Sequence, residues 1–327
     1  MAVLAEGQLD RARGALVGLA AGDALGGPYE FGPARGPELP IEMTGGGGLS
    51  WEPGEWTDDT SMAIVIARVA ADGVDLLSTT AQDRIVAGWA DWALSAPDVG
   101  IQTREVLAVA RSRPPVTAAA VREAAEQQHG RTGRTAGNGS LMRTAPVALA
   151  YLDDPAGLVR AATAISKLTH YDDDAAEACV LWCLAIRHAV LTRELDVRVG
   201  LDQLPAQRRQ LWSARIVEAA AGRPADFPNN GWVVHALQAA WSAIATTATG
   251  PRDGHVTRAL DAAARCGWDT DTVAAIAGSL IGAGCGASRV PAEWTKVLHG
   301  WPGLDAGGLA ALATTIVARP LWNPDSH

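Results

Sequence analysis

Lysine is nearly absent from this chain of 327 residues, which contains only Lys167 and Lys296. Arginine supplies the rest of the 27 basic side chains, and 36 acidic residues leave a formal net charge of −9 at pH 7. Proteins that bind nucleic acid or anionic membranes without specificity need a basic face. The charge therefore argues against both kinds of partner and leaves small, specific ligands open.

Cysteine and long apolar runs are also scarce. The four cysteines have neither the spacing of a metal site nor that of a disulfide framework, so we interpret them as reduced packing residues. The longest run of small residues, Ala274 to Ala287, is too short and too rich in glycine to span a bilayer. We expect a soluble, cytoplasmic protein, and the alanine-rich, lysine-poor composition suggests a GC-rich bacterial genome.

Helical periodicity fills most segments between glycine and proline residues, and few runs alternate as strands do. Alanine and glycine on many predicted helix faces allow close helix packing, and heptads are not sustained. Nothing resembles a linker. We expect an all-α fold, a compact single-domain helical bundle over residues 1–327. The predicted helices include Leu9–Ala21, Ser61–Ala71, Thr80–Leu94, Ala118–Gln128, Ala175–Leu191, Trp232–Ala248, Val256–Cys266 and Leu309–Val317.

Two similar acidic clusters carry the strongest chemical signal. Each begins with tryptophan, combines carboxylates with hydroxyls, and runs into a helix of small apolar residues. Packed carboxylates repel one another, and sites with only oxygen ligands select hard cations such as Mg²⁺, Mn²⁺ or Ca²⁺. The two clusters could build one dinuclear site. They are Trp56-Thr57-Asp58-Asp59-Thr60 and Trp268-Asp269-Thr270-Asp271-Thr272.

A simpler interpretation of each cluster is a helix start with nothing bound. Thr57 and Asp58 are good N-cap residues, and acidic residues suit the first turn of a helix. One such cluster would be common. Two near-copies, each with the same tryptophan and threonine neighbours, favour the shared cation site.

A glycine-rich segment, Gly137-Asn138-Gly139-Ser140, precedes a predicted helical stretch from Leu141 to Leu152. Backbone N–H groups at a helix N-terminus bind anions, and Arg131, Arg134 and Arg143 would make this neighbourhood positive. A phosphate or pyrophosphate would fit there. The alternative is a glycine turn with an Asn cap and solvated arginines.

Three further residues stand at predicted loops or helix starts. His170 precedes Tyr171 and three aspartates, and could either cap a helix or contact a ribose. Glu30 follows a glycine-rich turn after the first helix. Asp98 lies between two predicted helices and could be an ordinary N-cap.

The order of these segments along the chain resembles the successive motifs of the ADP-ribosylglycohydrolase family, including its dinitrogenase reductase-activating type. The pair Trp-Thr-Asp-Asp-Thr and Asp-x-Asp-Thr is the most specific part of the resemblance. The matching segments are Gly14–Phe31, Gly54–Ile64, Asp98–Thr103, Gly137–Pro146, Leu168–Tyr171 and Gly267–Gly282.

The resemblance implies an all-α domain whose cleft holds two Mg²⁺ or Mn²⁺ ions. It also implies that Gly137, Asn138, Gly139 and Ser140 cradle the ADP-ribose phosphates and that His170 lies along the same ligand. Asp98 matches an aspartate of the arginine-directed branch, and it joins Asp59 and Glu30 as a candidate catalytic residue. The implied metal ligands are Glu30, Thr57, Asp58, Asp59, Asp269, Asp271 and Thr272.

The implied reaction hydrolyses the N-glycosidic bond between ADP-ribose and an acceptor in an ADP-ribosylated protein. Such a reaction needs an oriented ribose, an activated water and a proton for the leaving nitrogen, and no side-chain nucleophile is evident. Asp98 favours arginine as the acceptor over serine, a nucleic-acid adduct or a small ester. A non-catalytic ADP-ribose reader and a dinuclear phosphohydrolase are the alternatives.

Overall fold

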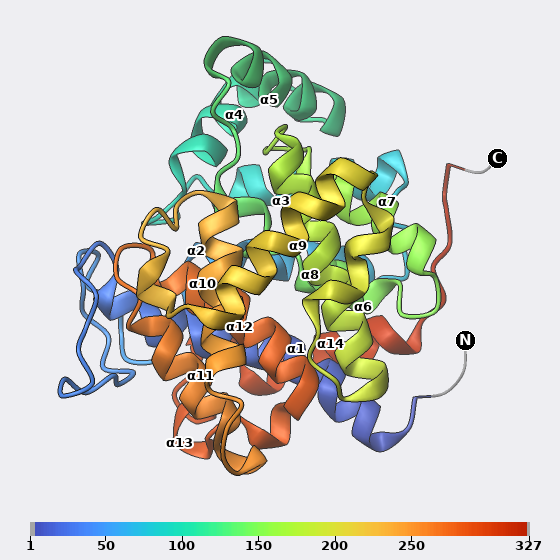
Figure 1. Ribbon diagram of the computed structural model, residues 1–327. Coiled ribbons are helices and arrows are strands. Elements are labelled where there is room, and N and C mark those ends of the chain that lie inside the picture. The colour runs from blue at the N-terminus through green and yellow to red at the C-terminus, as the bar shows by residue number, and fades with distance from the viewer. Residues whose placement is uncertain (1–3, 326–327) are drawn as a thin grey trace.

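The computed structural model describes residues 4–325, and within that range nearly all regular secondary structure is helical (Figure 1). This confirms the predicted all-α fold. Residues 1–3 and 326–327 of the predicted domain lie outside the described range. The elements are α1 (Glu6–Gly26), α2 (Asp58–Ala71), α3 (Thr79–Trp92), α4 (Ile101–Arg111), α5 (Ala118–Thr132), α6 (Ala145–Ala150), α7 (Pro155–Ser166), α8 (Asp173–Thr192), α9 (Ala206–Ala221), α10 (Val233–Thr246), α11 (His255–Ala264), α12 (Thr270–Cys285), α13 (Ala292–Thr295), β1 (His299–Gly300), β2 (Leu304–Asp305) and α14 (Ala306–Ala318).

Glycine allows α1 and α12 to pack together more extensively than any other pair of elements. A Cβ atom added to Gly18 would lie 2.3 Å from the carbonyl oxygen of Gly278, and one added to Gly22 would lie 1.9 Å from that of Ala274. Both distances are far inside van der Waals contact, so no larger residue fits without a shift of the backbone. This close packing brings the end of α1, with Asp23, against the start of α12.

The packing predicts that Gly22→Ala destabilises the protein by about 1 to 3 kcal/mol, the usual cost of overpacking a core. The change in the free energy of unfolding can be measured by urea denaturation. Gly7→Ala is the matched control on the same helix, because a Cβ there would meet only the Arg11 guanidinium at 3.6 Å. Alanine at an open helical position should leave stability equal or higher. Equal stability of both variants would contradict the packing argument.

The predicted helix boundaries hold within a few residues, with one clear exception. The stretch from Leu141 to Leu152 is not one helix, because α6 covers only Ala145–Ala150. Asn138–Ser140 forms a single 3-10 turn, and Leu141–Arg143 forms a further turn before α6. The glycine-rich segment therefore does not open an α-helix, and the expected anion site at a helix N-terminus is wrong in that form.

One helix within residues 4–325, α8, is long and apolar enough to cross a membrane by length and composition alone. Its most apolar 18-residue window is 72% buried inside the fold. Cys179 and Cys183 lie on this helix as buried thiols, in agreement with the interpretation of these cysteines as packing residues.

Candidate active site

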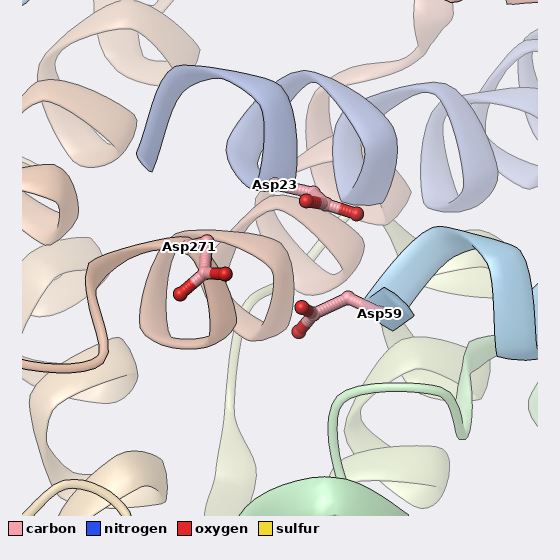
Figure 2. Close-up of side chains that lie close together, drawn as sticks. All are labelled: Asp23, Asp59 and Asp271. Carbon is pink, nitrogen blue, oxygen red and sulfur yellow. The ribbon is translucent and has the colours of Figure 1, made fainter. Parts of the chain in front are cut away.

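Three segments far apart in the sequence bring carboxylates together. Asp23 lies near the end of α1, Asp59 in the first turn of α2 and Asp271 in the first turn of α12, and their side chains face one another (Figure 2). One carboxylate oxygen of each lies within 4.8 Å of the others. Glu30, Asp269 and Asp271 form a second group within the same limit, so Asp271 belongs to both. The two acidic clusters of the sequence therefore converge as predicted.

Helix capping does not account for the side chains at these helix starts. Thr57 is the N-cap residue of α2 and Asp269 that of α12, yet neither side chain forms a capping hydrogen bond. The Thr57 hydroxyl is instead the donor toward two carboxylate oxygens, Oδ2 of Asp59 at 3.1 Å and Oδ2 of Asp271 at 3.5 Å. Thr57 is thus directed into the carboxylate group.

Asp23 is a member of the site that the sequence prediction missed. It is fully buried, and it accepts hydrogen bonds from the backbone N–H of Thr57, the backbone N–H of Thr60 and the Thr60 hydroxyl. Burial raises its pKa to about 6, although these hydrogen bonds oppose the rise. The sequence contains one feature from which Asp23 could have been identified as a site residue. It is an aspartate within the small-residue, apolar part of α1, where a buried charge needs partners.

Among the residues that the structure describes, no basic side chain pairs with the buried carboxylates of Asp59 and Asp271. Oδ1 of Asp59 and Oδ1 of Asp271 are buried without a hydrogen-bond partner. Burial, followed by repulsion from neighbouring carboxylates, raises the pKa of both residues well above the usual range. The same causes raise the pKa of Glu30 to about 9. Unpartnered oxygen ligands at this spacing fit hard divalent cations, and the residues present are therefore suited to the ions that the family resemblance implies.

Asp58 and Asp98 belong to an adjoining part of the site. Oδ2 of Asp58 accepts a hydrogen bond from the backbone N–H of Gly100 at 3.3 Å, and neither aspartate is part of the two close groups. Gly100, not Asp98, is the N-cap residue of α4. The alternative of Asp98 as a helix cap is therefore wrong. Burial, then repulsion from Asp269, raises the pKa of Asp98.

A cleft of about 360 Å³ opens over these carboxylates. The glycine-rich segment forms one wall, and the side-chain amide of Asn138 joins the wall to the second acidic cluster by donating to Oδ2 of Asp269 at 2.7 Å. The predicted site residues that line the cleft are Glu30, Asp58, Asp98, Gly137, Asn138, Gly139, His170, Asp269, Asp271 and Thr272. Thr57 and Asp59 do not line it, but both lie next to Asp271, which does.

Two expectations about the glycine-rich wall need correction. Ser140 is buried, and its hydroxyl accepts a hydrogen bond from Ser166 at 2.9 Å, so its side chain faces the core. Among the described residues, Arg104 lines the cleft and the three arginines expected there do not. Arg143 is fully buried, and Arg131 and Arg134 are exposed away from the cleft.

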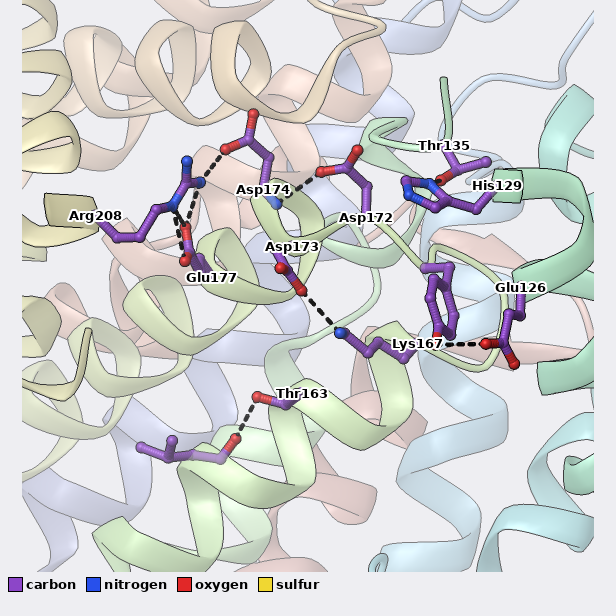
Figure 3. A network of polar contacts seen from close by, with 12 residues as sticks. Glu126, His129, Thr135, Thr163, Lys167, Asp172, Asp173, Asp174, Glu177 and Arg208 are labelled. Atoms are coloured by element: carbon purple, nitrogen blue, oxygen red, sulfur yellow. Dashed lines mark hydrogen bonds and ion pairs between the residues drawn. The ribbon is translucent and has the colours of Figure 1, made fainter. Parts of the chain in front are cut away.

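The acidic residues after His170 are structural (Figure 3). Asp172 caps α8 by accepting a hydrogen bond from the backbone N–H of Asp174 at 2.9 Å. Asp173 pairs with Lys167 at 2.8 Å, and Asp174 pairs with Arg208. Tyr171 donates its hydroxyl to Glu126, so it points away from the cleft and leaves His170 as the ligand candidate of this segment.

Comparison with known proteins identifies one family along nearly the whole chain. The ADP-ribosylglycohydrolase family matches residues 5–323. The ADP-ribosylarginine hydrolase Tri1 of Pseudomonas putida (strain GB-1) is 32% identical over 298 residues, covering 89% of this chain and 75% of that protein. The ADP-ribosyl-[dinitrogen reductase] glycohydrolase of Rhodospirillum rubrum is 30% identical, covering 88% of this chain and 90% of the relative.

The fold has a close structural relative of the same kind. A solved structure described as an ADP-ribosylglycohydrolase-related protein complex aligns with a TM-score of 0.70 and 27% identity, covering 96% of this chain and 99% of that one. Sequence and fold thus agree over the helices that carry the carboxylates. The chain belongs to the ADP-ribosylglycohydrolase family and is an enzyme of its hydrolase class.

Proposed function

We propose that this enzyme hydrolyses the N-glycosidic bond between ADP-ribose and an arginine side chain of a modified protein. The observation that carries the proposal is the pair of carboxylate groups that share Asp271 beneath a cleft lined by Asp98. Two relatives at 30% identity or more bear names that include an ADP-ribosylarginine hydrolase and a glycohydrolase of an ADP-ribosylated protein.

The two carboxylate groups fit two Mg²⁺ or Mn²⁺ ions. They share Asp271, and they contain both unpartnered oxygens, Oδ1 of Asp59 and Oδ1 of Asp271. The residues that would hold the ions are Glu30, Thr57, Asp58, Asp59, Asp269, Asp271 and Thr272, with Asp23 as an addition. When bound, such ions orient ribose hydroxyls and make a water molecule more acidic.

The remaining chemistry falls to the cleft residues. The backbone of Gly137 and Gly139 and the amide of Asn138 form a wall that suits the phosphates of ADP-ribose. Asp98 faces the cleft without a capping role, and a carboxyl group with a raised pKa can exchange a proton with the departing guanidine nitrogen. Glu30, which lines the cleft, and Asp59, through the ion that it would help to hold, would position the ribose and the water.

The proposed partner is an ADP-ribosylated protein, since a net charge of −9 disfavours binding to a nucleic-acid adduct. We place the reaction in the cytoplasm, where buried thiols such as Cys179 and Cys183 remain reduced.

The proposal is tested by incubating the enzyme with ADP-ribosylated arginine peptide, serine peptide and DNA, with and without Mg²⁺ or Mn²⁺. Release of intact ADP-ribose from the arginine peptide is the expected result. Release of AMP would instead indicate a phosphohydrolase, and binding without release would indicate an ADP-ribose reader. Faster release from serine or DNA would overturn the choice of arginine.

A further inference from the structure

A buried arginine lies behind the histidine of the cleft. The Arg143 guanidinium is fully buried 4.0 Å from the centre of the Trp89 ring, and its Nη2 donates to the Thr169 hydroxyl oxygen at 2.6 Å. Burial lowers the pKa of Arg143 to about 9, so it still carries a proton on every nitrogen at pH 7. A guanidinium can only donate hydrogen bonds. The Thr169 oxygen must therefore accept.

The proton of Thr169 then has one acceptor in reach. Its hydroxyl lies 2.8 Å from Nδ1 of His170, and within residues 4–325 the other side-chain partner of the oxygen is Arg143, which accepts nothing. The Thr169 hydroxyl therefore accepts from Arg143 and donates to Nδ1 of His170. In a neutral imidazole whose Nδ1 accepts, Nε2 carries the proton.

The other edge of the His170 ring faces the glycine-rich wall. A Cβ atom on Gly137 would lie 3.3 Å from Nε2, and one on Gly139 would lie 3.1 Å from it. His170 is 2% exposed and lines the cleft, and its Nε2 makes no hydrogen bond to any residue of the described range. Burial, and then the charge of Arg143, lowers the pKa of His170 well below its usual value, which keeps the ring neutral.

We propose that Arg143 and Thr169 are positioning residues that hold His170 in its Nε2–H tautomer and aim that donor at an oxygen of bound ADP-ribose. The inference rests on the proposed function for the identity of the ligand. The tautomer itself is a property of the ligand-free protein and can be measured without any reaction.

The tautomer is tested by ¹⁵N NMR of the histidine side chains, with His170→Gln to assign the signal. In the wild type, Nε2 of His170 should be protonated and Nδ1 unprotonated. Thr169→Val should no longer show this tautomer alone. The affinity for ADP-ribose, measured by calorimetry, should fall about 3- to 10-fold in Thr169→Val, the effect of one misdirected hydrogen bond. Thr169→Ser keeps the hydroxyl and should restore both readouts.

Protonated Nδ1 in the wild type would overturn the proposal, even if Thr169→Val failed to fold. An unchanged tautomer in a folded Thr169→Val would overturn it as well, as would unchanged ADP-ribose affinity. If the wild type has the expected tautomer and binds ADP-ribose but hydrolyses no substrate, the proposed reaction is refuted while the positioning role of Arg143 and Thr169 is supported.

An independent feature is a pair of exposed aromatic residues, Phe31, which lines the cleft, and Trp268, which pairs with the backbone beside it. Phe31 and Trp268 both have φ of 60°, a left-handed conformation that bulky residues rarely adopt. They are linked by hydrogen bonds from Phe31 N–H to the Trp268 carbonyl at 2.6 Å and from Trp268 N–H to the Gly32 carbonyl at 2.8 Å. Their side chains are 68% and 57% exposed. Strained backbone here presents two aromatic rings to solvent.

The position of these rings suggests their role. Phe31 directly follows Glu30 and Trp268 directly precedes Asp269, so each aromatic residue is next in sequence to a carboxylate of the cleft, and Phe31 itself lines the cleft. Trp56, at the equivalent place before the first acidic cluster, is buried and bonded through Nε1 to the Trp301 carbonyl. Packing explains Trp56 but leaves Trp268 unexplained.

We infer that Phe31 and Trp268 form an aromatic rim that binds the acceptor polypeptide at its modified arginine. A guanidinium stacks on aromatic faces, and the acidic cleft beside the rim complements its charge. This inference also rests on the proposed function, because it requires an arginine acceptor.

Trp268→Gly removes the ring and places the residue best suited to positive φ at this position, so stability should not fall. KM for an ADP-ribosylated arginine peptide, and the Kd of that peptide measured by calorimetry, should rise about 3- to 10-fold, as expected for loss of a stacked cation, with ADP-ribose affinity unchanged. Trp322→Ala is the control, because Trp322 is 56% exposed but its backbone pairs with Gly73 and Val74, which do not line the cleft.

An equal loss of ADP-ribose affinity in Trp268→Gly would overturn the acceptor role and indicate that the ring stacks on adenine. A KM matching that of Trp322→Ala would also overturn it. If peptide binding fell as expected but no variant released ADP-ribose, the rim would be supported and the proposed reaction refuted.

Discussion

Replacing Asp271 with alanine is expected to abolish hydrolysis, because Asp271 is the one carboxylate shared by both close groups. Both proposed cations would lose a ligand at once. The rate of hydrolysis should fall by more than about 100-fold. Losing a residue that only supports a metal ligand costs up to about 100-fold, and losing the ligand itself should cost more. Single-turnover release of ADP-ribose measures the rate, and calorimetry with Mg²⁺ and Mn²⁺ measures binding.

Thermal unfolding separates this effect from simple damage to the fold. The wild type should gain Tm when Mg²⁺ or Mn²⁺ is added, since an ion that binds only the native state stabilises it. Asp271→Ala should not show that gain. Without metal, its Tm should be at least as high as that of the wild type, because one buried carboxylate that repels its neighbours is gone. Asp202→Ala, at an exposed surface pair with Arg209, should behave as wild type.

Chelation gives the matching result without mutation. EDTA should inactivate the wild type reversibly, and added Mg²⁺ or Mn²⁺ should restore activity. Full activity after exhaustive chelation, or an undiminished rise in Tm for Asp271→Ala with added metal, would contradict the proposed metal site.

The convergence of the acidic clusters could be predicted because their signal is local and repeated. Asp58-Asp59 and Asp269-Thr270-Asp271 each start a helix of small residues, and helical period identifies those helices. The close approach of α1 and α12 follows from glycines that the sequence also displays. These features depend on residue spacing alone.

The features that were missed depend on tertiary contacts. Asp23 looks like an isolated acid on an apolar helix until Thr57 and Thr60 are folded against it. Arg143 was expected in the positive neighbourhood of the glycine-rich segment, but it is buried under Trp89, because the turn before α6 directs it inward. The sequence does not show in which direction a charged side chain points, whereas the fold does.

The same limit applies to the two tryptophans before the acidic clusters. Trp56 and Trp268 have nearly identical neighbours in the sequence, yet one is buried and the other is 57% exposed. The difference arises from the backbone of Trp268, whose left-handed conformation and pairing with Gly32 turn the ring outward. Local pattern could not distinguish them.

Asp98→Asn is expected to lower kcat on ADP-ribosylated arginine peptide by about 10² to 10⁴, the range attributed to general acid–base catalysis. Asparagine keeps the shape of the side chain and loses the exchangeable proton. Because Asp98 lines the cleft and does not cap α4, ADP-ribose affinity and Tm should stay near those of the wild type. Steady-state kinetics, calorimetry and thermal unfolding measure the three quantities.

The matched control is Asp154→Asn. Asp154 does cap a helix, since it accepts a hydrogen bond from the backbone N–H of Gly157 at 2.8 Å at the start of α7. Asparagine caps about as well as aspartate, so this variant should keep both turnover and stability. A loss of kcat confined to Asp98→Asn, with binding unchanged, is the pattern of an interaction made in the transition state. Turnover equal in the two variants would remove Asp98 from the chemistry, and with it the main structural reason for choosing arginine as the acceptor.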